Sequence, residues 1–272
     1  MASRKQQKEE ARQRRLEQER ARTAQAQRRQ RIWMLGGVLA AAVVVVVVAV
    51  AISLGGTSSA KAPKPGTPQA KQTFSEVSSL LGGIPQSGTT LGNPNAKVTI
   101  DYYGDLECPI CRAFTLGLDG GGFPQMVKDL VRTGKVKVVY LSFCTATCTN
   151  HSHTLFNQQQ VAAYSAGQQK LFWDYADLFY HEQGDETTSY VNTAYLNDLA
   201  KQIPSLDLKT WQTDQTDPSL LSQVQGEDSQ ASKLNLPGTP TLVAIGPTHE
   251  TLVNGGNFPT YSTILQAVNA VS

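Results

Sequence analysis

A run of 23 residues without any charged side chain, from Ile32 to Leu54, limits what this chain can fold into more than any other feature. An α-helix rises about 1.5 Å per residue, so roughly 20 apolar residues cross the hydrocarbon core of a membrane. Trp33 stands at the basic edge of the run, where interfacial aromatic side chains are favoured. We therefore predict a single, uncleaved transmembrane helix at residues 32–54.

A cleaved signal peptide is the alternative, because Ala60-Lys61-Ala62 offers a small-x-small cleavage site. The apolar run is longer than the roughly 7–15 residues of a signal h-region, which favours the anchor. Residues 1–31 hold eleven Lys and Arg against four acidic residues, and such a basic tail stays in the cytoplasm. Both alternatives export everything after residue 55, so we predict a single-pass protein of the cell membrane with an extracytoplasmic domain.

The part of the chain after residue 31 holds 13 Lys and Arg and 18 acidic residues. This split is expected of a basic tail attached to a mildly acidic globular domain. This charge balance argues against nucleic acid as a partner of the folded part.

The exported part starts with a linker and a short helix at residues 55–87. Three prolines among small residues predict a spacer at 55–72, and Thr73–Leu81 is expected to be helical. The stretch from Gly82 to Asn95 is rich in turn-forming residues. Two β-branched and aromatic runs at 98–103 and 136–141 predict strands, and helical patterns between them complete a βαβ unit.

Residues of about 150–235 lack strand signals and show apolar side chains at helical spacing. A third strand is expected at Pro240–Ile245, a fourth near 251–253 and a closing helix at 259–271. The pattern predicts an α/β domain over residues 88–272 with an inserted, all-helical subdomain.

The motif Cys108-Pro109-Ile110-Cys111 lies between the first predicted strand and a predicted helix. Thiol–disulfide exchange needs an attacking thiolate and a second thiol that resolves the mixed disulfide. A helix start favours the thiolate of the first cysteine, and Pro109 suits the first helical turn. An inert disulfide and half of a zinc site are the alternatives, but the strand-to-helix position favours a catalytic dithiol with Cys108 as nucleophile and Cys111 as resolving thiol. Neither cofactor nor metal is expected.

Four segments in this order resemble the DsbA-like thiol–disulfide oxidoreductases, which are thioredoxin domains with a helical insertion. The segments are Leu91–Ile100, Gly104–Cys111, Gln169–Trp173 and Gly238–Thr241, and the resemblance covers about residues 88–272. It implies a thioredoxin-like fold, preceded here by the transmembrane helix. It also implies that Pro240 follows a cis peptide bond beside the dithiol and that the Thr239 backbone pairs with an extended substrate.

The same resemblance implies that the enzyme acts on thiols of exported proteins and is reoxidised by a membrane partner linked to quinone. One position departs from the family pattern. Related proteins often carry a buried acid six residues before the first cysteine, and Tyr102 stands there in this chain. Asp101, Asp105 and Glu107 are the nearby acids, and Glu107 is expected to raise the pKa of Cys108 through like charge.

The second cysteine pair is Cys144 and Cys148, followed by His151 and His153. In an oxidising compartment a structural disulfide is the favoured interpretation. An auxiliary redox pair and a metal site stay open, although the four groups are crowded into ten residues.

For the whole protein we predict a disulfide-forming oxidoreductase. A reductase or isomerase is the first alternative, because Pro109-Ile110 supplies no charge that sets the direction of electron flow. A non-catalytic module that binds polypeptides is the second.

Overall fold

The computed structural model describes residues 64–272 of the chain. They belong to the second of two compact units, Ser59–Ser272. The predicted basic tail, the transmembrane helix and the first part of the linker lie outside the described residues. Within residues 64–272, no helix is both long and apolar enough to span a membrane.

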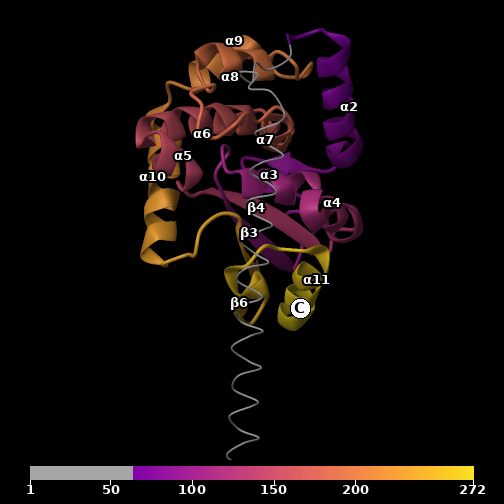
Figure 1. Cartoon of the computed structure of the whole chain (residues 1–272). Helices are drawn as coiled ribbons and strands as arrows, with labels where there is room; N and C mark the ends of the chain where they lie inside the picture. Colours follow the sequence, from indigo (N-terminus) through magenta and orange to yellow (C-terminus); the bar gives the residue numbers. More distant parts are fainter. Residues whose placement is uncertain (1–63) are drawn as a thin grey trace, which may run out of the picture. The chain divides into compact units, whose positions relative to one another are not determined.

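The described chain builds a six-stranded sheet with the strand order β1-β2-β4-β3-β5-β6 (Figure 1). The strands are β1 Gln86–Ser87, β2 Thr90–Leu91, β3 Val98–Gly104, β4 Val136–Ser142, β5 Thr241–Ile245 and β6 Glu250–Leu252. The central strands β3 and β4 are parallel, and the other neighbouring pairs are antiparallel. Parallel neighbours require a crossover connection, so the predicted βαβ unit is confirmed.

Helices cover both sides of this sheet. They are α2 Pro68–Leu81, α3 Pro109–Leu116, α4 Phe123–Met126, α5 Ala146–Asn150, α6 His153–Gln168, α7 Phe172–His181, α8 Thr193–Ala200, α9 Leu208–Asp214, α10 Pro218–Lys233 and α11 Tyr261–Val271. A π-helical turn continues α4, and short 3-10 turns follow α3 and β6. In Figure 1, α6 to α9 lie above β4 and α11 lies below β3.

The helices α5 to α10 all fall between β4 and β5, where the inserted helical block is predicted. Side chains connect this block to the sheet. The indole Nε1 of Trp173 donates to the carbonyl oxygen of Thr89 at 2.9 Å, and the backbone N of Ser142 donates to Glu227 of α10 at 2.8 Å. Because buried polar groups are satisfied across the boundary, the insertion and the sheet form one folded unit.

An aromatic cluster fills the space between the sheet and α7. Tyr102 of β3 packs edge-on against Phe114 and Tyr140, with ring centroids 5.1 and 5.4 Å apart. Phe123 stacks on Trp173 at 5.2 Å. All five side chains are buried, and burial of one such side chain contributes about 1.5–3 kcal/mol. The aromatic stretch around Phe172–Tyr180 is thus part of the core.

The helix expected at Thr73–Leu81 is found but starts earlier, and the turn-rich stretch also holds two short strands. Helix α2 begins at Pro68, inside the predicted spacer, because Thr67 caps its N-terminus and Pro68 suits the first turn. The turn-rich stretch 82–95 contains β1 and β2, whose two-residue length gives no periodicity for sequence reasoning to detect.

Candidate active site

The dithiol lies where β3 passes into α3. Strand β3 ends at Gly104, and a Cβ atom there would meet the ring of Tyr140 at 2.5 Å, so the close approach requires glycine. The backbone turns over the next residues, with the N–H of Cys108 donating to the carbonyl oxygen of Asp105 at 3.1 Å. Cys108 is the N-cap of α3 and Pro109 opens its first turn. The predicted strand-to-helix placement is therefore found.

The two sulfur atoms differ in their surroundings. Both thiols are free; Cys108 is 5% exposed and Cys111 is fully buried. A hydrogen bond with Cys111 lowers the pKa of Cys108, and a further one with Thr239 acts in the same direction. Burial raises the pKa of Cys111 well above its ordinary value. The pair can therefore hold a thiolate on the outer sulfur and a proton on the inner one.

Residues far away in the sequence complete the site. The peptide bond between Thr239 and Pro240 is cis, and the Thr239 carbonyl oxygen accepts a hydrogen bond from the Cys108 thiol at 3.4 Å. The Thr239 hydroxyl lies 2.5 Å from that of Thr145. The structure thus brings Thr239 and the start of β5 beside the dithiol, while Ile110 is half exposed next to it.

Asp105 organises the backbone behind Cys108. Its carboxylate accepts hydrogen bonds from the N–H groups of Glu107, Thr145 and Thr147, and from the Thr147 hydroxyl. Burial raises the pKa of Asp105, and these hydrogen bonds oppose the rise. Asp105 is also the carboxylate whose charge raises the pKa of Cys108, although the net shift of that pKa is downward. Glu107, expected to raise this pKa, is not among the groups that act most strongly on it, and its carboxyl lies beside His151.

Glu107 lies in a buried polar cluster with His151, Gln159 and Tyr190. Its carboxyl is fully buried, and both of its oxygens lack a hydrogen bond among the described residues. His151 places its Nε2 3.8 Å from Oε1 of Glu107. Burial, followed by the charge of Asp105, raises the pKa of Glu107 to about 7. This carboxyl can gain or lose a proton near neutral pH.

The other candidate acids fall away from the dithiol. Asp101 lies on the opposite face of β3, where burial and the charges of Glu250 and Glu227 raise its pKa to about 6. Tyr102 points inward, and its hydroxyl lies 3.2 Å from that of Thr115 and donates to that of Tyr180 at 3.3 Å. Hydroxyl groups therefore occupy the place of the family's buried acid.

A disulfide joins Cys144 and Cys148, whose Cα atoms are 5.6 Å apart. The loop that it closes contains Thr145 and Thr147, which contact Asp105 and Thr239. The second cysteine pair is thus a neighbour of the dithiol, although the two pairs are 33 residues apart in sequence.

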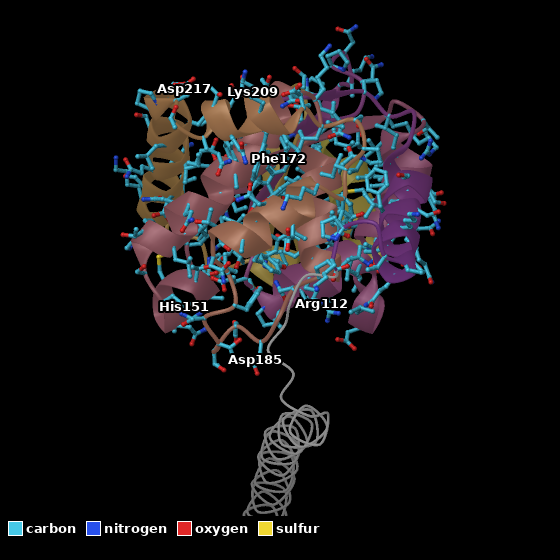
Figure 2. The ribbon with its side chains drawn as sticks, turned by 90° about the horizontal axis from the view of Figure 1, so that it is seen from above. Arg112, His151, Phe172, Asp185, Lys209 and Asp217 are labelled. Atoms are coloured by element: carbon cyan, nitrogen blue, oxygen red, sulfur yellow. A yellow bond between two sulfur atoms is a disulfide. The ribbon has the colours of Figure 1, made fainter. Side chains whose placement is uncertain are left out.

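Two side chains that contact the site could not be identified from the sequence. Gln183 donates from Nε2 to the carbonyl oxygens of Leu106 and Cys108, and Arg112 donates from Nε to that of Tyr180. Figure 2 shows Arg112, Asp185 and His151 along one edge of the domain, with Lys209 and Asp217 at the opposite edge. Arg112 lies on α3 and Gln183 follows α7, and neither belongs to a repeating pattern, so sequence reasoning misses them.

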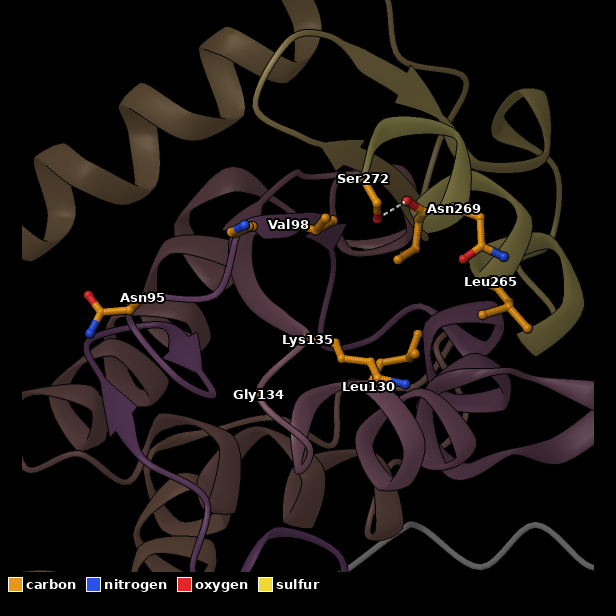
Figure 3. A pocket seen from close by; sticks show the side chains of 10 residues that line it. Asn95, Val98, Leu130, Gly134, Lys135, Leu265, Asn269 and Ser272 are labelled. Atoms are coloured by element: carbon orange, nitrogen blue, oxygen red, sulfur yellow. Dashed lines mark hydrogen bonds between the residues drawn. The ribbon is translucent and has the colours of Figure 1, made fainter.

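A pocket of about 470 Å³ lies elsewhere (Figure 3). Val98, Leu130 and Val268 form part of its apolar lining, with Lys97 and Lys135 among its polar residues. Val98 opens β3, whereas Cys108 follows the end of that strand. The pocket is therefore remote from the dithiol.

Comparisons with known proteins agree with this geometry. The profile of the family described as Thioredoxin matches residues 86–258. Disulfide bond formation protein D of Bacillus subtilis (strain 168) is 26% identical over 152 residues, which are 56% of this chain and 65% of that protein. The probable disulfide bond formation protein D of Bacillus anthracis is 23% identical over 158 residues, 58% of this chain and 69% of that protein. The chain thus aligns with slightly less than two thirds of the Bacillus subtilis protein.

Solved structures show the same fold. The oxidised form of BdbD from Bacillus subtilis superposes with a TM-score of 0.56 at 23% identity, covering 68% of this chain and 95% of that one. DsbA2 of Pseudomonas aeruginosa gives 0.52 at 20% identity, covering 70% and 97%. Since the family profile spans most of the described domain, and the sheet, the insertion and the dithiol occupy the expected places, the chain belongs to the thioredoxin family.

Proposed function

We propose that this protein is a thiol–disulfide oxidoreductase that forms disulfides in exported polypeptides. The asymmetry of the dithiol supports this most directly, because the pKa of Cys108 is lowered while that of Cys111 is raised. A stabilised thiolate stabilises the reduced enzyme, and a stable reduced form makes the oxidised form a stronger oxidant. The names of the related Bacillus proteins, which refer to disulfide bond formation, agree with this direction.

The reaction starts from the oxidised enzyme. A thiolate of the client attacks the sulfur of Cys108, the Cys108–Cys111 bond breaks, and Cys111 leaves as a thiolate that takes up a proton. The second client thiolate attacks the client sulfur of the mixed disulfide, and Cys108 leaves as the stabilised thiolate. Two electrons have then passed from the client to the enzyme, and the client carries a new disulfide.

Thr239 and Pro240 would hold the client during this exchange. The Thr239 carbonyl oxygen already lies beside the sulfur of Cys108. Residues 239–240 precede β5, so their backbone groups lie outside the strand pairing of the sheet and can bind an extended chain. Main-chain pairing of this kind accepts many sequences. The half-exposed Ile110 adds an apolar contact at the rim.

The reduction potential of the Cys108/Cys111 pair tests the direction of electron flow. We expect equilibration with glutathione to give a potential well above that of thioredoxin, which is about −270 mV. A value at or below that of thioredoxin would show a reductase instead. In a parallel assay, Cys111→Ser should trap clients as mixed disulfides at Cys108, and Cys108→Ser should trap none.

We further propose that residues 32–54 anchor the enzyme with its domain outside the cytoplasm, where a quinone-linked membrane protein reoxidises it. The apolar run and the basic tail support the anchor. Intact cells treated with a mild reductant and then a membrane-impermeant maleimide should show labelled Cys108. Labelling that requires cell lysis would contradict this orientation.

A further inference from the structure

A second cluster of metal-ligating side chains lies around the Cys144–Cys148 disulfide. The two sulfur atoms and a ring nitrogen of His153 lie within 4.8 Å of one another. Asp228 of α10 approaches from another part of the chain, with Oδ2 3.7 Å from Nδ1 of His153. The other oxygen of Asp228 accepts the backbone N–H of Cys144 at 2.8 Å. Two sulfurs and one imidazole therefore lie together, and the Asp228 carboxylate lies next to the imidazole.

In the sequence, two cysteines and two histidines lie within ten residues, which is too crowded for all four to bind one metal ion. In the structure only one of the two histidines faces the cysteines. His151 turns to the buried carboxyl of Glu107 and takes no part in the cluster. His153, at the first turn of α6, is the histidine that faces the cysteines. The fourth group comes from α10, which no spacing within residues 144–153 could have indicated.

We propose that reduction of the Cys144–Cys148 disulfide creates a zinc site formed by both thiolates, His153 and Asp228. Sulfur, imidazole and carboxylate are the usual ligands of Zn²⁺. With Zn–S near 2.3 Å and Zn–N near 2.0 Å, a tetrahedral ion keeps neighbouring ligand atoms roughly 3.5–3.8 Å apart. The His153 nitrogen lies within 4.8 Å of both sulfurs and 3.7 Å from Asp228 Oδ2, so small movements bring it into such a site, and the Asp228 carboxylate would turn from His153 toward the sulfurs.

Charge favours a cation in the reduced state. Two thiolates beside the Asp228 carboxylate would repel one another, and a divalent ion offsets most of that charge. The site is also accessible from solvent, because the side chain of His153 is 72% exposed and that of Asp228 is 17% exposed. A metal can therefore enter without opening of the core.

The chemistry balances with an external dithiol as the reductant. Its two electrons and two protons convert the Cys144–Cys148 bond into two thiols, and the dithiol itself becomes a disulfide. Zinc binding then displaces both thiol protons, so affinity rises with pH. Reoxidation of the two cysteines would release the ion.

The site would tether the same loop in both redox states. Thr145 and Thr147 lie between the two cysteines and contact Asp105 and Thr239 at the dithiol. A covalent bond holds this loop when the cysteines are oxidised, and the ion would hold it when they are reduced. The proposal does not depend on catalysis by Cys108, so it stands or falls separately from the proposed function.

Cobalt titration of the full-length protein tests the site. The chain carries Cys108→Ser and Cys111→Ser, which leaves Cys144 and Cys148 as its cysteines, and a phosphine reduces them. We expect one Co²⁺ per chain, with a thiolate-to-cobalt charge-transfer band and the ligand-field bands of tetrahedral cobalt. Zn²⁺ should displace the cobalt, and the oxidised protein should give neither band.

Single substitutions identify the ligands. His153→Ala and Asp228→Asn should each weaken zinc binding at least about 10-fold, whereas the exposed His249→Ala should leave it unchanged. Absence of the tetrahedral spectrum, equal binding by the oxidised protein, or unchanged affinity of His153→Ala would overturn the proposal. In the reduced wild-type protein, zinc should protect Cys144 and Cys148 from alkylation, and equal alkylation with and without zinc would contradict it too.

Discussion

The two cysteine pairs of this protein lie close together but differ in spacing, in bonding and in their surroundings. Cys108 and Cys111 are separated by two residues at a helix start, are free in the structure and differ in burial. Cys144 and Cys148 are separated by three residues, are half-buried to a similar degree and are joined. Both pairs follow the end of a central parallel strand, so their different states accompany different spacing and different surroundings of the sulfurs.

Hydrogen bonding makes the difference. Hydrogen bonds with Cys111 and with Thr239 lower the pKa of Cys108. The backbone around Cys144 is instead held by the carboxylate of Asp228, whose negative charge disfavours a thiolate. The surroundings of Cys108 thus favour a thiolate, and those of Cys144 do not.

Removal of the outer sulfur of the dithiol should have the largest effect. Cys108→Ser should abolish oxidation of a reduced two-cysteine polypeptide, because no mixed disulfide can form. The double variant Cys144→Ser/Cys148→Ser should retain most of this activity when measured at a temperature where it is folded. Equal loss in both proteins would show that the second pair carries electrons and would break the comparison.

Asp105 accepts hydrogen bonds from the backbone next to Cys108 and from the loop between Cys144 and Cys148, so its removal should affect both pairs. Asp105→Ala leaves the N–H groups of Thr145 and Thr147 without their acceptor and should lower the free energy of unfolding by roughly 3 kcal/mol. Urea denaturation measures this. The conservative Asp105→Asn keeps one carbonyl acceptor and should lose less; a larger loss than for alanine would contradict the assignment of Asp105 as an acceptor.

The titration of Glu107, which lies next to the dithiol, should make the free energy of unfolding depend on pH. Its pKa is about 7 in the folded protein, against an ordinary value of 4.5. Between these values the folded protein binds one more proton than the unfolded chain, so stability falls as pH rises through this window. Glu107→Gln removes the titration and should gain up to about 3 kcal/mol over wild type between pH 4.5 and 7.

Urea denaturation at both pH values checks this gain. Asp119→Asn removes one exposed carboxylate elsewhere and is the control for the change in net charge. A Glu107→Gln variant whose stability relative to wild type does not change with pH would mean that the carboxyl is hydrated and ordinary in its titration.

The second pair should matter for stability more than for chemistry. In the chain-entropy account, a disulfide that closes so short a loop contributes about 2 kcal/mol. We expect the double variant Cys144→Ser/Cys148→Ser to lose this amount in urea denaturation without zinc. No loss would mean that the hydrogen bonds to Asp105 hold the loop without the disulfide.

The sequence predicted the dithiol region well because its signals are local. A β-branched strand, a proline at the first helical turn and two cysteines at fixed spacing all lie within residues 98–111. Thr239 and Pro240 were reached through the family resemblance, since nothing local ties them to Cys108. The inserted helices were also predicted, because their apolar faces repeat at helical spacing.

The surroundings of the second pair could not be predicted in the same way. Asp228 and Asp105 reach the loop from positions 84 and 42 residues away from their partners. Which of two adjacent histidines faces the cysteines depends on how α5 ends at His151 and α6 begins at His153. Tertiary packing determines these contacts, so they cannot be predicted from the pattern within one helix or strand.

The smallest expected effect concerns the one hydroxyl pair that joins the two regions. Thr145 and Thr239 share a hydrogen bond of 2.5 Å between the disulfide loop and the segment beside Cys108. Thr145→Val keeps the shape of the side chain and should cost about 1 kcal/mol of stability. It should also change the rate of Cys108 alkylation, because the carbonyl oxygen of Thr239 touches that thiol. Thr149→Val, at an exposed position in the short helix that Thr145 precedes, is the matched control. If both variants alkylate at the wild-type rate, the loop is only a neighbour of the dithiol, and the two pairs act independently.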